Sequence, residues 1–342
     1  MFLRMSRVLV GVCLGIILIT SAAVAADASR FSRREVTFKN GDIELHGTVT
    51  VPTTAGKHAA VVFLHGSGPS TREGALPYAE EFAKMGLASL CFDKRGCGSS
   101  GGSWLRASLD DLSEDGIAAM AFLKTQAEVD ASRIGLWGIS QAGWVATNAA
   151  TKTKDIAFMI IVSGGGASPR ETEMFAYRAT FKHAGLSDAE TAEAFKVIDA
   201  YFGFLSTGEG REQLVKQLDA SKTSAWYQYA PLDRILPSPE NRMNWSWVAN
   251  WDPAPAIARI ECPVFLMFGD LDMNLPTDVA VKQWRDGLNA AGNKDVTIMV
   301  FPGAAHGIRM GEHDARGRAP FAPGYSESML GWLWQHVIEG EK

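Results

Sequence analysis

Six apolar runs, separated by segments with a helical pattern, constrain the fold of this 342-residue chain more than any other feature. The runs lie at 59–64, 87–92, 134–137, 156–162, 264–268 and 296–301. Strands that are apolar at nearly every position are buried on both faces, which is the pattern of a parallel sheet covered by helices. With 46% hydrophobic residues, the chain can also form one large core.

The segments between these runs predict helices and one hairpin. In residues 108–124, apolar side chains recur along one stripe, which is typical of an amphipathic helix. Residues 141–152 and 278–291 also have helical patterns. Residues 34–51 instead alternate in polarity around an Asn-Gly pair, which predicts a β-hairpin. We therefore expect a doubly wound, mostly parallel α/β sheet with an antiparallel hairpin at its start.

Residues 168–255 interrupt the alternation of strands and helices. Ser187 and Glu190 form a capping box ahead of an amphipathic pattern, and a second helix is suggested further on. Several prolines then mark an irregular return to the sheet. We expect residues 168–255 to be a helical cap inserted into a core that is built from residues 26–167 and 256–342.

The first residues have the pattern of a targeting segment. Arg4 and Arg7 precede an apolar stretch over 8–20, and an Ala-Val-Ala sequence at 23–25 provides a cleavage site. We expect residues 1–25 to be a signal peptide, and the mature protein to be secreted or periplasmic with no membrane span. An uncleaved membrane anchor is the alternative, although the apolar stretch is short for a span.

The charge of the chain argues against nucleic acid as a partner, and the spacing of its cysteines argues against a bound metal ion. Removal of residues 1–25 takes away two arginines and no acidic residue, so the formal charge changes from −5 to −7. A mildly acidic chain without a cluster of Lys and Arg lacks the electrostatic pattern of a nucleic-acid-binding protein. Cys91, Cys97 and Cys262 have no metal-binding spacing, and buried free thiols are the simplest interpretation. The oligomeric state has no signal in the sequence.

Ser140 lies where a strand, a tight turn and a helix are expected to meet. It follows the apolar run 134–137 through Gly138 and precedes the small residues Ala142 and Gly143. This is the context of a nucleophile elbow, in which the serine hydroxyl group is exposed above the sheet and the next backbone N–H points towards the attacked carbonyl. Ala142 replaces the second glycine of the G-x-S-x-G pattern, and its methyl group tightens the turn.

Residues 96–102 contain two competing glycine motifs. Ser100 matches G-x-S-x-G literally, and the glycines of this segment match the dinucleotide-binding fingerprint. Residues 93–95 separate both motifs from the preceding strand, and no second strand that ends in an acid follows at the required distance. We therefore expect Ser140, and not Ser100, to be the nucleophile.

The HGSGP sequence at 65–69 follows the first apolar run. A glycine-rich turn at the carboxyl end of a strand can direct backbone N–H groups towards an oxyanion that forms during acyl transfer. An ordinary tight turn is the alternative. We expect the backbone N–H groups of Ser67 and Gln141 to form an oxyanion hole.

Two further loops complete a predicted catalytic triad. Asp272 follows the fifth apolar run, and a carboxylate at a strand end can hold the Nδ1–H group of a histidine. Asp270 is the neighbouring alternative, but Pro276, four residues after Asp272, favours Asp272. His306 follows the last apolar run. Ser140, the acid and the histidine then occur in the chain order that hydrolase triads have.

With these motifs, the chain resembles the α/β-hydrolase superfamily. The HGSGP turn, the FDKRGCGSS loop at 92–100 and the GISQAG elbow are similar to those of bacterial esterases near the dienelactone hydrolases and the prolyl oligopeptidase-like peptidases. The resemblance covers about residues 34–165 and 255–338 and leaves the cap unmatched. It implies the α/β-hydrolase fold and catalysis by a Ser/Asp/His triad, without a metal or an organic cofactor.

The substrate is less constrained than the chemistry. The cap holds 13 of the chain's 33 Phe, Trp and Tyr residues, so we expect an apolar acyl or aryl pocket that includes Trp144. No acidic or basic anchor for a peptide terminus is evident. We therefore expect a carboxylesterase that cleaves a small-molecule ester through an acyl-enzyme. The alternatives are an exopeptidase or acyl-aminoacyl peptidase, an acyltransferase or thioesterase, and a non-catalytic binding protein on a hydrolase scaffold.

Overall fold

The computed structural model describes residues 30–311 and 319–339 of the chain. Its strands are β1 (Phe31–Asn40), β2 (Ile43–Pro52), β3 (His58–Phe63), β4 (Ala88–Phe92), β5 (Val129–Ile139), β6 (Met159–Val162), β7 (Val264–Gly269) and β8 (Val296–Phe301). In the described residues they form one eight-stranded sheet with the order β1-β2-β4-β3-β5-β6-β7-β8. β2 pairs antiparallel with both β1 and β4, whereas all other neighbours are parallel.

The burial of these strands confirms the expected sheet. Every residue of β3, β4, β6 and β7 is buried, as the apolar runs predict. β1 and β2 form the predicted hairpin, and Gly41 takes the left-handed conformation that its turn requires, with a φ of +56°. β8 lies at one edge of the sheet, and only its last residue, Phe301, is fully buried. The fold is the predicted doubly wound, mostly parallel α/β sheet.

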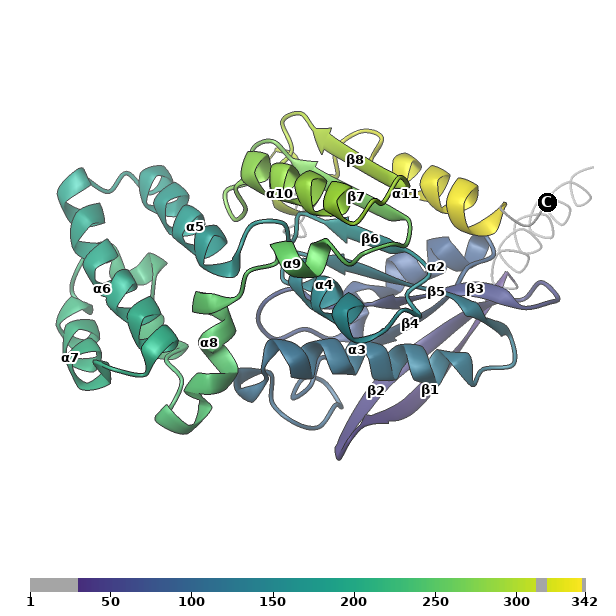
Figure 1. Ribbon diagram of the computed structural model, residues 1–342, viewed down its shortest axis with the longest axis horizontal. Coiled ribbons are helices and arrows are strands. Elements are labelled where there is room, and N and C mark those ends of the chain that lie inside the picture. Colours follow the sequence, from purple (N-terminus) through teal and green to yellow (C-terminus); the bar gives the residue numbers. More distant parts are fainter. Residues whose placement is uncertain (1–29, 312–318, 340–342) are drawn as a thin grey trace, which may run out of the picture.

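Helices cover both faces of the sheet (Figure 1). These core helices are α2 (Leu76–Lys84), α3 (Leu109–Lys124), α4 (Ala142–Lys152), α9 (Ala254–Ile257), α10 (Thr277–Ala290) and α11 (Tyr325–Leu333). On one face, Leu112, Trp144 and Trp284 from α3, α4 and α10 pack into a hydrophobic core. On the other face, Phe82 from α2 and Trp332 from α11 belong to a second core. Burial on both sides explains why the central strands are apolar throughout.

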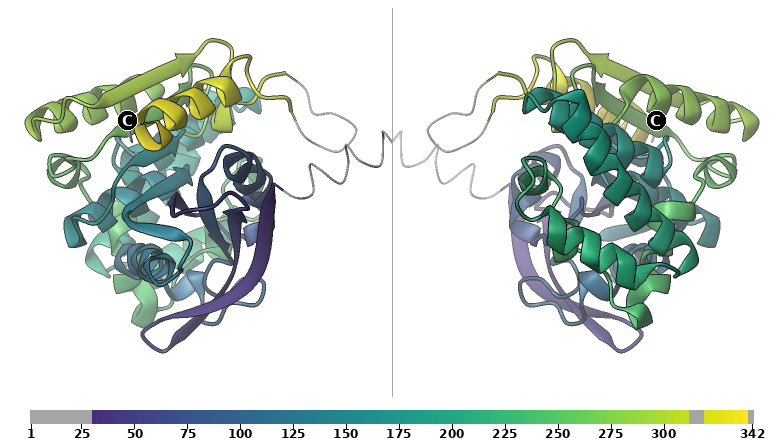
Figure 2. Two further views of the ribbon diagram at one scale, coloured as in Figure 1. Left: turned by 90° about the vertical axis from the view of Figure 1, so that its right-hand side faces the viewer. Right: turned by 90° about the vertical axis from the view of Figure 1, so that its left-hand side faces the viewer.

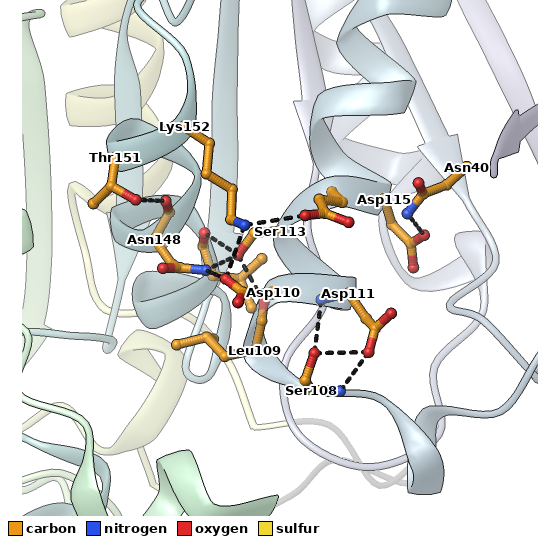
Figure 3. Close-up of polar contacts among 12 residues, drawn as sticks. Asn40, Ser108, Leu109, Asp110, Asp111, Ser113, Asp115, Asn148, Thr151 and Lys152 are labelled. Atoms are coloured by element: carbon orange, nitrogen blue, oxygen red, sulfur yellow. Dashed lines mark hydrogen bonds and ion pairs between the residues drawn. The ribbon is translucent and has the colours of Figure 1, made fainter. Parts of the chain in front are cut away.

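Polar side chains join α3 to α4, the helix that begins just after Ser140 (Figure 3). Ser113 Oγ lies 3.0 Å from the backbone oxygen of Val145. Asn148 Nδ2 donates to Asp110 Oδ1 at 2.8 Å, and Lys152 Nζ lies 2.9 Å from the same carboxylate oxygen. These contacts fix the position of α4 on the core, and they therefore fix the turn that precedes it.

A second group of helices lies between β6 and β7 in the chain. We call this group the cap; it contains α5 (Pro169–His183), α6 (Asp188–Thr207), α7 (Arg211–Ser221) and α8 (Arg242–Asn250). In Figure 1 the cap extends from one side of the sheet, and the right-hand view of Figure 2 looks onto it. Ser187 and Glu190 form both hydrogen bonds of the capping box at the start of α6. α9 follows the cap, and its residue Ile257 is already part of the core beneath α10.

The cap has a hydrophobic core of its own. Phe181, Phe202, Leu214 and Trp226 are buried in this cluster, which is distinct from the two clusters on the faces of the sheet. The cap is therefore packed as a unit and does not depend on the sheet for the burial of its largest side chains.

The predicted signal peptide, residues 1–25, lies outside the described residues. Within the described residues, none of the helices has the length and apolar character needed to cross a bilayer.

The three cysteines of the described chain carry free thiols. Burial raises the pKa of the Cys262 thiol to about 12, so this group stays protonated and unreactive. In the same part of the chain, no group of three or more His, Cys, Asp or Glu side chains is arranged to hold a metal ion.

Candidate active site

Ser140 occupies a strained turn directly after β5. Its φ is +59°, a left-handed conformation that residues other than glycine rarely adopt. The turn leaves no room for larger neighbours, because a Cβ on Gly138 would lie 2.3 Å from Ala142 Cβ. A Cβ on Gly143 would lie 2.4 Å from the backbone nitrogen of Gly165. This geometry is that of a nucleophile elbow, and the Ala142 methyl group fills the space that Gly138 leaves open.

Asp272 and His306 meet beyond the carboxyl ends of β7 and β8. His306 Nδ1 lies 2.8 Å from Asp272 Oδ2. The backbone N–H groups of Asn274 and Leu275 donate to the other oxygen, Oδ1, at 2.8 and 3.1 Å. The Asp272 side chain is fully buried, whereas that of His306 is 25% exposed. The carboxylate therefore favours the imidazole tautomer with its proton on Nδ1, which leaves Nε2 able to accept a proton.

The loop after β6 connects the serine turn to the histidine loop. Ser163 Oγ accepts the backbone N–H of Gly307 at 3.1 Å. A Cβ on the next residue, Gly164, would lie 2.3 Å from the backbone oxygen of Ser140. These contacts bring Ser140 and His306 to the same edge of the sheet. Ser163 was not predicted; its φ of +46° and its contact with the histidine loop become visible only in the folded chain.

The two competing candidates, Asp270 and Ser100, have structural contacts. Asp270 is exposed, and its Oδ1 accepts the backbone N–H of Gly303 at 2.6 Å. Ser100 is buried, and its hydroxyl group donates to the backbone oxygen of Asp93 at 2.7 Å. The same hydroxyl oxygen accepts the backbone N–H of His46 at 2.9 Å. These contacts explain both residues as supports of the loops in which they lie.

The glycine-rich turn at 65–69 lies next to the elbow. A Cβ on Gly66 would be 3.7 Å from Ser140 Cβ, which is ordinary contact. Ser67 and Gln141 line the same cavity. Across the described ranges, no hydrogen bond engages the backbone N–H of either residue. Both predicted oxyanion donors are therefore free to bind a ligand atom.

The buried side chain of Lys94 binds the backbone of this turn. Lys94 Nζ donates to the backbone oxygens of Gly66 at 2.9 Å and Gly68 at 3.1 Å. It also donates to Gln141 Oε1 at 2.9 Å. Burial lowers the pKa of Lys94 to about 8. The ammonium group thus fixes the carbonyls on both sides of Ser67, and it links this turn to the elbow.

His65, at the start of the same turn, is also held in place. Its Nε2 lies 2.6 Å from the backbone oxygen of Phe92 at the end of β4. Burial lowers the pKa of His65 to about 4, so its ring is neutral at physiological pH.

A cavity of about 190 Å³ lies between the core and the cap, beside the oxyanion turn. Trp144, the predicted substrate-binding residue, lines this cavity and donates its Nε1–H to the backbone oxygen of Ala167 at 2.9 Å. The cavity has seven aromatic side chains in its wall, which are Trp104, Trp144, Tyr177, Tyr201, Phe202, Trp245 and Trp247. The wall is thus mainly apolar, as expected for the binding of an acyl or aryl group.

One carboxylic acid also lines the cavity. Glu173 lies on α5, is partly buried, and within the described ranges has no hydrogen bond or ion pair on its side chain. Burial raises its pKa to about 7. This glutamate was not predicted from the sequence, because a glutamate in a polar segment at the start of a helix is usually exposed. Its place on the cavity arises only when α5 packs against α6 and α8.

The class of the protein follows from this fold and this site. The model of the alpha/beta hydrolase family matches residues 61–318, which is more than half of the chain. The chain therefore belongs to the alpha/beta hydrolase family, and the resemblance seen in its motifs is confirmed.

Several known proteins are similar to this chain. The quorum-quenching protein AidA of Acinetobacter baumannii is 25% identical over 260 residues, which cover 72% of this chain and 81% of AidA. Among solved structures, the esterase Pf2001 of Pyrococcus furiosus has a TM-score of 0.58 and 18% identity, over 90% of this chain and 91% of Pf2001. The acylaminoacyl peptidase of Pyrococcus horikoshii has a TM-score of 0.60 and 18% identity, over 94% of this chain and 44% of the peptidase. At such identities, the structural similarity supports the fold alone.

Proposed function

We propose that this protein is a serine carboxylesterase in which Ser140 is the nucleophile, His306 the base and Asp272 the residue that orients the histidine. The observation that carries this proposal is the 2.8 Å contact between His306 Nδ1 and Asp272 Oδ2, at the same sheet edge as a serine on a strained elbow. Membership of the alpha/beta hydrolase family supports hydrolysis as the class of reaction. The esterase EstD of Thermotoga maritima, which is 23% identical to this chain over 293 residues, supports esters as substrates.

The reaction proceeds through an acyl-enzyme. Ser140 Oγ attacks the ester carbonyl carbon while His306 Nε2 takes the hydroxyl proton, and the backbone N–H groups of Ser67 and Gln141 donate to the oxyanion. The tetrahedral intermediate then expels the alcohol, which receives that proton from His306. A water molecule loses a proton to His306 and attacks the acyl carbon, which releases the acid and returns the proton to Ser140. Asp272 stabilises the imidazolium that forms in both steps.

Labelling of the nucleophile tests the mechanism directly. A fluorophosphonate should modify Ser140 in active protein, and peptide mass spectrometry identifies the labelled residue. Ser100→Ala is the matched control and should retain the label, whereas Ser140→Ala should lose both label and activity. A label on Ser100, or active protein without a label on Ser140, would contradict the proposal.

Turnover of a series of p-nitrophenyl esters tests the substrate class. Each methylene group that fits the aromatic cavity should improve kcat/KM by a few-fold, since its burial is worth at most about 0.8 kcal/mol. The profile should rise from acetate, reach a maximum and fall once the acyl group exceeds the cavity. Faster turnover of matched thioesters or aminoacyl anilides would favour a thioesterase or an exopeptidase. Preferential transfer to an added alcohol would favour an acyltransferase.

We also propose that residues 1–25 direct export, so that the enzyme acts in the periplasm or outside the cell. The order of basic, apolar and small residues supports this. Mass spectrometry of protein from the periplasm and the medium should find a mature N-terminus near Ala26. An intact N-terminus in the membrane fraction would instead favour an anchor.

A further inference from the structure

The cavity between the core and the cap combines aromatic rings with one carboxyl group. Tyr177, one helical turn further along α5, and Tyr201 on α6 line the cavity together with Glu173. Burial, and after it the charge of Glu173, raises the pKa of both phenols. Trp245 and Trp247 on α8 line the same cavity. The cavity wall thus combines the carboxyl group of Glu173 with rings that come from three helices of the cap.

Within residues 30–311 and 319–339, no hydrogen bond or ion pair joins the Glu173 carboxyl group to a cationic side chain. Lys94 is the basic residue among those that line the cavity, and its ammonium group is bound to the oxyanion turn and to Gln141. Arg170, on the same helix as Glu173, lies over the ring of Phe202 and pairs with Asp199 at 3.8 Å. Partial burial of a carboxyl group without a partner raises the free energy of its charged form. Binding of a cation beside the carboxylate offsets this electrostatic cost.

We propose that Glu173 and the surrounding rings form a binding site for the ammonium group of the substrate. The substrate class is then an ester with an organic cation on an apolar frame, whose carbonyl group lies at Ser140 while its cation lies at Glu173. This inference rests on the proposed function for the placement of the carbonyl group, but the cation site itself does not depend on catalysis.

Two physical effects act together at such a site. Aromatic faces attract a cation through the negative charge density above the ring, most strongly where water is excluded. A carboxylate adds charge pairing and discriminates against a neutral group of equal shape. An uncharged tert-butyl group is buried in the cavity to the same extent but makes neither of these interactions. Comparison of a cation with its neutral isostere therefore separates the two electrostatic effects from the burial of apolar surface.

The binding experiment uses the Ser140→Ala protein, in which no turnover occurs. Phenyltrimethylammonium and its uncharged isostere tert-butylbenzene are titrated, and binding is followed by tryptophan fluorescence. The cation should bind about tenfold more tightly than the isostere, and Glu173→Gln should reduce this difference to the part that the aromatic rings contribute. Glu171→Gln is the matched control, because Glu171 is an exposed acid on the same helix and does not line the cavity. Equal affinities for the two probes, or an unchanged cation affinity in Glu173→Gln, would overturn the inference.

The pH dependence of binding provides a second measurement on the same protein. The titratable groups that line the cavity are Lys94, Glu173, Tyr177 and Tyr201. Cation affinity should rise between about pH 6 and about pH 8, as Glu173 loses its proton with a pKa of about 7. Glu173→Gln should remove the part of this rise that belongs to the glutamate. A rise that persists in full would assign it to Lys94 and would overturn the role of Glu173.

Turnover by the unaltered protein separates this inference from the proposed function. Butyrylcholine should be hydrolysed with a higher kcat/KM than its isostere 3,3-dimethylbutyl butyrate, and Glu173→Gln should reduce this preference to the part that the aromatic rings contribute. Hydrolysis of both esters without a preference would overturn the cation site as a substrate site and leave the esterase standing. Cation binding without hydrolysis of any ester would contradict the proposed esterase function but would still support the cation-binding site.

Discussion

Asp270 and Asp272 lie two residues apart on one loop, but they have different surroundings. Asp272 is buried against His306, whereas Asp270 is exposed and holds the turn at Gly303. Asp272→Asn should lower kcat by about 10⁴-fold, since an amide favours the wrong tautomer of the histidine. Asp270→Asn should retain most activity, because its amide oxygen still accepts the same hydrogen bond. Steady-state kinetics of the two variants measures this. Loss of activity in Asp270→Asn but not in Asp272→Asn would identify Asp270 as the acid that orients His306.

Lys94 holds the glycine-rich turn at 65–69, in which we propose that Ser67 donates to the oxyanion, through the backbone oxygens of Gly66 and Gly68. In Lys94→Met the carbonyls of Gly66 and Gly68 lose a shared donor, so the Ser67 N–H should no longer be held in place. We expect kcat to fall by about tenfold or more while KM changes little, because the loss affects a transition-state contact. Lys282→Met, at an exposed lysine on α10, is the control for loss of a positive charge. Thermal unfolding should verify that both variants are folded; a fall in kcat/KM caused only by KM would contradict the positioning role.

The residues of the site differ in how far the sequence could predict them. Ser140, Asp272 and His306 could be proposed as a triad from the sequence because each follows a strand with a local motif, and the sheet brings the carboxyl ends of those strands to one edge. Lys94 and Glu173 carry no local motif. Their environments arise when segments distant in sequence pack around them, so their burial and lowered or raised pKa values have no signature in the chain alone.

At the scale of elements, two glycines within helices have opposite surroundings. A Cβ on Gly143 of α4 would collide with the backbone of Gly164 and Gly165, whereas a Cβ on Gly203 of α6 would meet open space. Gly143→Ala should destabilise the protein by about 1–3 kcal/mol through overpacking and distort the elbow. Gly203→Ala should stabilise it by about 0.5–1 kcal/mol. Denaturant unfolding and fluorophosphonate labelling test both; normal labelling of a stable Gly143→Ala protein would contradict the tight turn.

Helices were harder to predict than strands, for a reason of length. The central strands can be recognised in the sequence as apolar runs. The long helix α3 has a stripe of apolar side chains that repeats over four turns. α2 and α11 have nine residues each and were not predicted. In α2 only Ala79, Phe82 and Ala83 are buried, and so few positions do not distinguish a helix from a loop.

At the scale of the whole molecule, the pKa of Glu173 makes global stability depend on pH. Its pKa is about 7 in the folded protein against an ordinary value of 4.5, so ionisation favours the unfolded chain. This penalty is absent below about pH 4.5, grows up to about pH 7 and is complete above it. Glu173→Gln should therefore raise the free energy of unfolding by about 1–3 kcal/mol at pH 8 and by much less at pH 4.5. Urea unfolding at both pH values measures this, and an equal effect at both would contradict it.

The separate hydrophobic core of the cap affects how such an enzyme can evolve. Tyr201 and Phe202 belong to this core and also line the cavity, so mutations there would change one wall of the cavity while the elbow and its neighbouring glycines stay unchanged. Mutations in the cap can therefore change substrate binding with little effect on the residues around Ser140. A lineage that inherits this architecture is free to exchange or redesign residues 169–250 for new substrates, whereas the backbone contacts around Ser140 leave little heritable variation at the chemistry itself.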